Sequence, residues 1–164
     1  MFFEVTKLYA DYSCEEKIES RNPVFTWAAE HELPDEKQTA CRVEVWREAR
    51  PVWDSGWVEQ EEPRLQYAGP ALESLCNYGV RLTLRDSEGR ESAEGYSELQ
   101  TPMYEAWPAE WIAAPEDRPG CAPYFRRVFS GKGIQRAVLC CCGIGYQSVT
   151  INGEPVDDLS LIHI

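Results

Sequence analysis

The chain has 164 residues, of which 43% are hydrophobic, and its six Trp, eight Tyr and five Phe can fill the core of one or two folded domains. A formal net charge of −12 repels phosphate backbones and anionic lipids, so composition argues against nucleic-acid and membrane partners. Neutral sugars, a protein partner or a second copy of the chain, giving a homo-oligomer, are compatible with it.

The N-terminal segment reads MFFEVTKLYADYSCEEKIES, and Glu4 and Lys7 interrupt its apolar run too early for the core of a signal peptide. No stretch reaches the length of a membrane-spanning helix. The seven cysteines are an odd number and make a poor disulfide framework. We therefore expect a cytoplasmic protein with free thiols.

Short alternating runs separated by Pro and Gly occupy the first hundred residues and predict an all-β fold. In the turn DSEG that follows residue 85, Gly89 is free to adopt a positive φ. The segment YSELQT is predicted to be the last strand of a first sandwich. The predicted core faces of two earlier strands are Cys41, Val43 and Val45 in one, and Tyr78, Val80, Leu82 and Leu84 in the other.

The proline-containing segment PMYEAWPAEW interrupts this pattern, and we place a domain boundary between residues 104 and 105. Beyond it, strands are predicted at 124–129, 136–143 and 146–151, and the pair Asn152-Gly153 favours a type I′ hairpin with EPVDD as the returning strand. A sandwich usually takes about 100 residues, so a second domain of this size is predicted to be incomplete, with open sheet edges.

Two motifs of the first hundred residues resemble a fibronectin type III domain. VFTWAAE is similar to the early strand whose tryptophan, here Trp27, fills the sandwich core. LESLCNYGVRLTLRDSEGRES is similar to the later turn and strand. The resemblance implies a tyrosine corner made by Leu72 and Tyr78, in which the phenol bonds to upstream backbone.

A narrower resemblance covers nearly the whole chain. The motifs NPVFTW, QTACRVEVW, WDSGWVEQ, LQYAGPALES, WPAEWIAAP, YFRRVF and GIGYQSVTINGEPVDD occur in the order found in the N-terminal region of bacterial α-L-rhamnosidases of glycoside hydrolase family 78. This resemblance implies a fibronectin-like domain over 1–104 and a truncated jelly-roll domain over 105–158. The cysteine run at 140–142 replaces commoner aliphatic residues.

The resemblance also implies the reaction of a parent enzyme, which would hydrolyse terminal α-L-rhamnose from glycosides with inversion. Inversion needs two carboxyl groups about 6.5–9.5 Å apart, and in the family these belong to a later helical barrel. The chain is thus expected to be a non-catalytic fragment, so we assign it no catalytic, cofactor-binding or metal-binding residue.

The last six residues, LSLIHI at 159–164, back-translate with one choice of codons to a transposon end used to tag sequencing libraries. We interpret them as a non-native tail after Asp158. A natural edge strand is the alternative.

Other residues that could carry chemistry are more simply structural. The adjacent thiols of Cys140–Cys142 would alternate between the faces of a strand, so they are expected to fill space and not to hold zinc. His31 is expected in a polar loop and His163 lies in the tail, which leaves no base for a nucleophilic site. Asp157 and Asp158 are a weak candidate for calcium, and the remaining acids are interpreted as solvated surface.

Tryptophans can stack on sugar rings, which keeps a second class of function open. Trp27 is expected in the core, and Trp107 and Trp111 between the domains, while Trp53 and Trp57 flank DSG in a predicted exposed turn. The alternative function is therefore a non-catalytic carbohydrate-binding or adhesion protein of two β-sandwiches. A cytosolic protein-interaction module is a third reading.

Overall fold

A computed structural model describes residues 3–11, 20–33, 35–115, 120–144 and 147–157. All the regular secondary structure of these residues is β, which confirms the predicted all-β class. No helix in this part of the chain is long and apolar enough to cross a membrane. The chain divides into two compact units, Met1–Ile112 and Ala113–Ile164, and each is described by itself. The boundary predicted at 104/105 stays a prediction.

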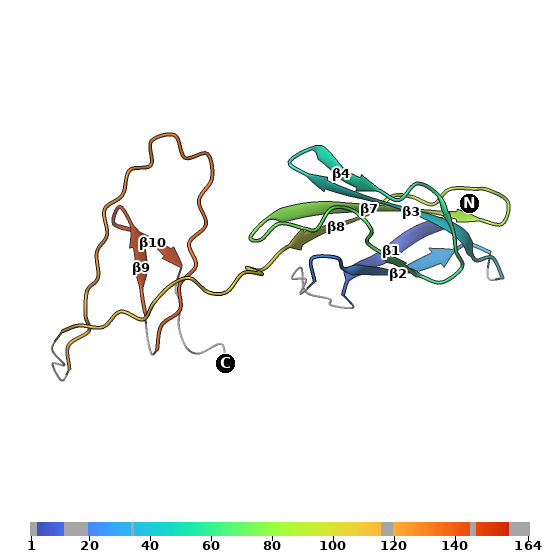
Figure 1. The fold of residues 1–164 in the computed structure, drawn as a ribbon. Helices are drawn as coiled ribbons and strands as arrows, with labels where there is room; N and C mark the ends of the chain where they lie inside the picture. The colour runs from blue at the N-terminus through green and yellow to red at the C-terminus, as the bar shows by residue number, and fades with distance from the viewer. Residues whose placement is uncertain (1–2, 12–19, 34, 116–119, 145–146, 158–164) are drawn as a thin grey trace. The chain divides into compact units, whose positions relative to one another are not determined.

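The first unit is a sandwich of two antiparallel sheets (Figure 1). One sheet has the order β1-β2-β6. The other has the order β4-β3-β7-β8, and the short β5 also pairs with β3. The strands of this unit are β1 Phe3–Ala10, β2 Val24–His31, β3 Gln38–Arg47, β4 Arg50–Asp54, β5 Val58–Glu59, β6 Arg64–Gln66, β7 Asn77–Asp86 and β8 Gly95–Gln100.

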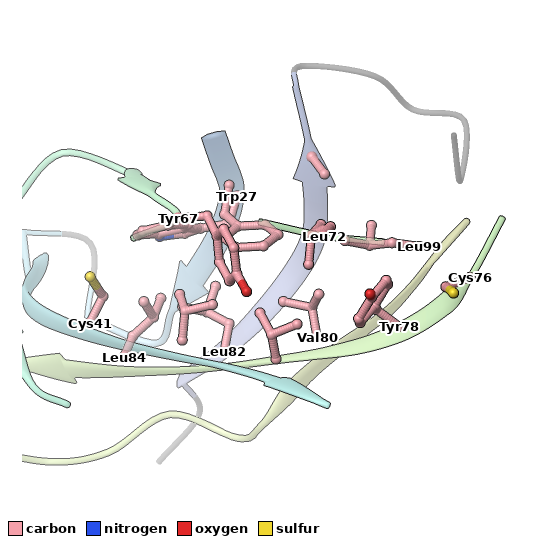
Figure 2. Close-up of a cluster of buried hydrophobic side chains, with 14 residues drawn as sticks. Trp27, Cys41, Tyr67, Leu72, Cys76, Tyr78, Val80, Leu82, Leu84 and Leu99 are labelled. Atoms are coloured by element: carbon pink, nitrogen blue, oxygen red, sulfur yellow. The ribbon is translucent and has the colours of Figure 1, made fainter. Parts of the chain in front are cut away.

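Alternate residues of β3 and β7 build the core between the two sheets. Because side chains of a strand alternate between its faces, every second residue points inward, and Val80, Leu82 and Leu84 face Trp27 and Tyr67 of the opposite layer (Figure 2). The predicted core face is therefore confirmed. The members with no solvent exposure are Cys41, Val43, Val45, Val80, Leu82 and Leu84.

The tyrosine corner forms as the sequence implies. Tyr78 and Leu72 are both buried, and the Tyr78 hydroxyl accepts a hydrogen bond of 3.0 Å from the backbone N–H of Glu73. The corner ties the segment between β6 and β7 to the start of β7, so it fixes how the chain passes from one sheet to the other.

The WDSG motif breaks one edge strand in two. Ser55 places its hydroxyl where it accepts the Val43 backbone N–H at 2.9 Å, while its own N–H donates to the Val43 carbonyl at 3.0 Å. Asp54 receives two hydrogen bonds, of 3.0 and 2.6 Å, from the Arg42 guanidinium, and Gly56 has φ +61°. The motif therefore connects β4 to β5, and both strands pair with β3. Its role is structural.

The segment after β8, which we call the exit segment (residues 101–105), is bonded back onto the sandwich. Thr101 is buried, and the Tyr104 hydroxyl donates to the carbonyl of Ser20 at 2.8 Å. The Arg21 guanidinium lies 4.5 Å from the centre of the Tyr104 ring and pairs with Glu105. Contacts with Ser20 and Arg21, in the loop before β2, thus hold the exit segment against the sandwich.

In the second unit the described strands form one hairpin, β9 Val149–Ile151 with β10 Glu154–Asp157. Asn152 and Gly153 have φ values of 54° and 90°, so the predicted type I′ turn is confirmed. The prediction of strands at 124–129 and 136–143 is wrong, because neither segment pairs with another strand in the described part of the chain. An alternating pattern becomes a strand only where a neighbour supplies the backbone partners. The jelly-roll prediction stays untested.

Candidate binding surface

The tryptophans proposed as sugar platforms are engaged within the first unit. The Trp53 ring packs edge-on against Tyr67, with ring centres 4.9 Å apart, and the Arg85 guanidinium covers Trp57 at 3.8 Å from the ring centre. Both residues are half-buried, so the predicted exposed turn is wrong. Trp27 is in the core as predicted, and Trp107 and Trp111 are exposed; their packing between domains stays a prediction.

His31 ends β2 and does not lie in a polar loop, which corrects the prediction. Its side chain is 6% exposed. Because Nδ1 accepts the Leu33 backbone N–H at 3.0 Å, the ring proton is on Nε2, which donates to Asp86 Oδ2 at 3.2 Å. The imidazole is therefore held in one tautomer. His163 lies outside the described residues.

Asp86 is the centre of this cluster, and its side chain is fully buried. It accepts hydrogen bonds from the backbone N–H groups of Glu88 at 3.0 Å and Arg90 at 2.8 Å, and from Arg90 Nε at 2.6 Å. Burial by itself would raise the pKa of Asp86, but the hydrogen bonds from Arg90 and His31 outweigh it and lower the pKa to about 2. The cluster joins the ends of β2 and β7 to the turn after β7, so its role is to close one end of the sandwich.

The cysteines separate into two environments. Cys41 and Cys76 are buried in the first unit, as structural thiols are expected to be. Cys121, Cys141 and Cys142 are exposed and Cys140 is half-buried. Residues 140–142 form no strand. The prediction that the three adjacent cysteines lie in a strand and fill space is therefore wrong. Cys14 and Asp158 lie outside the described residues. The side chain of Asp157 is not described either. Within the described part, no group of three His, Cys, Asp or Glu could hold a metal ion.

A shallow groove of about 360 Å³ lies on the outer face of the five-stranded sheet that contains β3, β7 and β8. We call it the Trp46–Tyr96 groove. The register sets Trp46 of β3 opposite Gly79 of β7, and Gly79 opposite Glu98 of β8. Among the residues that line it are Trp46, Glu48, Gly79, Arg81, Tyr96 and Glu98.

Gly79 forms the floor of the groove. A Cβ atom at this position would lie 3.0 Å from the Tyr96 hydroxyl and 3.2 Å from Cε2 of the Tyr96 ring, so Tyr96 leans over the glycine from the neighbouring strand. Because Gly79 has no side chain, the Tyr96 ring can lie over it on the outer face of the sheet.

Polar neighbours hold the side chains of the groove in place. The Tyr96 hydroxyl donates to Glu98 at 3.2 Å, and burial together with this hydrogen bond raises the pKa of Tyr96. Arg81 pairs with Glu94 at 3.3 Å, and its guanidinium lies 5.1 Å from the centre of the Trp46 ring. The indole N–H of Trp46 is shielded from solvent and has no acceptor among the described residues. The groove thus offers two aromatic rings beside donors and acceptors.

Sequence reasoning missed this groove, although part of the signal was present. Trp46 and Arg81 are out of phase with the core residues of their strands, so alternation places both on the outer face. Their meeting with Tyr96 depends on the pairing of β3 with β7 and of β7 with β8, and that register is not written in any one segment.

The described carboxyl groups that have a shifted pKa do not resemble a general acid. A catalytic acid needs a raised pKa. Among the described carboxyls whose pKa departs from its ordinary range, every departure is downward. Hydrogen bonds from Ser87 lower the pKa of Glu36, one from Arg42 lowers that of Asp54, and bonds from Ser74 and Arg21 lower that of Glu105.

These features define a class: a two-sheet immunoglobulin-type sandwich whose described residues offer a shallow aromatic groove. The chain belongs to the family described as the Rha78A-like, N-terminal immunoglobulin domain, which it matches over residues 7–103. This confirms the family resemblance seen in the sequence.

Relatives agree with this assignment. The chain is 25% identical over 176 residues to an α-L-rhamnosidase of Formosa agariphila, covering 86% of the chain and 18% of that protein. It is similar to the crystal structure of Streptomyces avermitilis α-L-rhamnosidase complexed with L-rhamnose, at 28% identity and a TM-score of 0.63 over 69% of the chain and 12% of the enzyme. For α-L-rhamnosidase from Dictyoglumus thermophilum the values are 27% and 0.62, over 74% and 16%. The chain therefore spans less than a fifth of the length of these relatives.

Proposed function

We propose that the chain is a non-catalytic N-terminal part of an α-L-rhamnosidase whose complete form hydrolyses terminal α-L-rhamnose from glycosides with inversion. The observation that carries this proposal is the match of residues 7–103 to a domain found at the N-terminus of such enzymes. The two α-L-rhamnosidase structures with TM-scores above 0.6 support it as well.

The chemistry of the described residues supports the non-catalytic part of the proposal. Inverting hydrolysis requires one carboxylic acid with a raised pKa and one carboxylate that activates water. The shifted carboxyls of the first unit are hydrogen-bonded and more acidic than usual. The paired carboxyls of the reaction would thus belong to another domain of the complete enzyme.

The test begins with the source DNA beyond the codon of Asp158. We expect a frame that continues into further domains, whose complete product releases 4-nitrophenol from 4-nitrophenyl α-L-rhamnopyranoside, while the purified 164-residue chain does not. Turnover by the 164-residue chain would refute its non-catalytic role. A genomic stop directly after Ile164 would refute the enzyme and favour a free-standing sugar-binding protein.

A cytoplasmic location is part of the same proposal. It is supported by the thiols of Cys41 in the core and of Cys141 and Cys142 at the surface, which are free, because exposed thiols persist in a reducing compartment. Alkylation of intact cells followed by mass spectrometry should find these thiols unpaired, whereas disulfides between them would contradict the assignment.

A further inference from the structure

We propose that the Trp46–Tyr96 groove is a binding site for a single neutral pyranose ring. The groove is made wholly by the first unit, from β3, β7 and β8. Its volume of about 360 Å³ falls at the lower end of the range for small-molecule sites, which suits one sugar ring better than an extended chain.

The walls of the groove fit the two kinds of surface that a pyranose presents. The exposed Tyr96 ring offers a flat apolar face for the C–H side of a sugar, next to the Trp46 ring, over which the Arg81 guanidinium lies. Tyr96 is 58% exposed, so its ring is accessible to a ligand. Gly79 lets the Tyr96 ring lie close to the sheet, because a side chain at this position would displace Tyr96.

Polar groups around the rings fit sugar hydroxyls. Glu48 and Glu98 can accept hydrogen bonds and Arg81 can donate them. The Trp46 indole N–H is a shielded donor without an acceptor in the described residues. A buried donor left unpaired is destabilising, and a ligand oxygen that reached this N–H would pair it.

Charge selects a neutral ligand. Two carboxylates and one guanidinium line the groove, and the guanidinium is already paired with Glu94. The whole chain carries a net charge of −12. The lining therefore carries more negative than positive charge, and an anionic sugar should bind less well than a neutral one.

The test uses the complete 164-residue chain labelled with ¹⁵N. The indole N–H signal of Trp46 is assigned from its loss in Trp46→Phe, and the chain is titrated separately with L-rhamnose and D-glucose. We expect a saturable shift of the Trp46 signal with a Kd of about 1–10 mM for at least one of these sugars, as is reasonable for a shallow site. The Trp111 signal is the internal reference, because this indole is 70% exposed and does not line the groove.

Two variants and a charged probe sharpen the test. Tyr96→Ala removes an exposed ring without touching the core and should weaken binding at least tenfold, while Trp111→Ala should leave it unchanged. D-glucuronate, which differs from D-glucose by one carboxylate, should bind more weakly than D-glucose.

The proposal is overturned if the Trp46 signal stays fixed with both neutral sugars, if it moves only in parallel with that of Trp111, or if Tyr96→Ala binds like the parent chain. Tighter binding of D-glucuronate would overturn the charge argument. L-rhamnose is chosen from the proposed function and D-glucose is independent of it. Binding of D-glucose alone would keep the site and remove its link to rhamnose, whereas loss of the enzyme assignment would leave the titration unaffected.

Discussion

The two units of this chain use similar apolar residues with opposite results. In the first unit, Val80, Leu82 and Leu84 alternate along β7 and are wholly buried. In the second, Tyr124 is 83% exposed and Ile144 is 90% exposed. An alternating apolar segment therefore does not form a buried strand by itself. It also needs a neighbouring strand that supplies backbone hydrogen-bond partners and a second layer that covers its inner face.

The largest effect should come from truncating the same residue type in both units. Leu82→Ala removes a side chain with no solvent exposure, whereas Leu139 is 54% exposed. We expect Leu82→Ala to lower the free energy of unfolding of the first unit by about 2–5 kcal/mol, and Leu139→Ala to change that of the second unit, to which it belongs, by less than about 0.5 kcal/mol. Urea unfolding of the complete chain measures both. Equal losses would mean that Leu139 is buried in solution, and the contrast between the units would fail.

The next largest effect should appear at low pH, where the stability of the first unit should prove to depend on the buried charge of Asp86 as well as on apolar contacts. The pKa of Asp86 is lowered from 3.8 to about 2 in the folded chain. Its contribution to stability is therefore complete above about pH 4 and is lost as the pH falls toward about 2. Urea midpoints measured across this range should fall, and the fall should be smaller in Asp86→Asn. An identical pH dependence in both proteins would contradict the role of this carboxylate.

The tyrosine corner offers a smaller and more local test. Tyr78→Phe keeps the buried ring but removes the acceptor for the Glu73 N–H, which should cost about 1–3 kcal/mol of unfolding free energy. Tyr124→Phe is the matched control, because Tyr124 is 83% exposed. Differential scanning calorimetry should show a lower Tm for Tyr78→Phe alone. A shift of similar size in both variants would mean that the hydroxyl at 78 has no special role.

The smallest effect belongs to the hairpin of the second unit. Gly153 has φ +90°, so Gly153→Ala should destabilise the β9–β10 pairing by about 1 kcal/mol. Gly131→Ala is the control, since Gly131 has open space around it and a φ outside the left-handed region. Amide hydrogen exchange across Ile151 and Glu154 should accelerate in the first variant only. Unchanged exchange would place the stability of the hairpin elsewhere.

The sequence predicted the features that depend on neighbouring residues, and it did not predict those that depend on contacts between residues far apart in the chain. Alternation in β7 and the turn signals at Gly89 and Asn152-Gly153 are local, and each was confirmed: the N–H of Gly89 donates to the carbonyl of Asp86 at 3.1 Å, and Asn152 has φ 54°. The hairpin between β3 and β4 gave no such signal. Its turn places Glu48 and Ala49 at positive φ, residues that rarely mark a type I′ turn.

The failures share a dependence on distant partners. His31 looked like a loop residue because its acceptor, Asp86, is 55 positions away in the sequence. The Trp46–Tyr96 groove needs two strand registers to be known at once. The strand predicted at 124–129 required a neighbour that local pattern cannot guarantee.

The exit segment has a mechanical consequence. Tyr104 and Glu105 are bonded to Ser20 and Arg21, and Thr101 is bonded to the carbonyl of Glu73 at 2.6 Å. Tension applied beyond Glu105 would reach these bonds before it reached the edge of β8, and it would load several of them at the same time. Because resistance to force is governed by the barrier to unfolding, the first unit should act as a firm anchor for whatever is pulled from its C-terminal side.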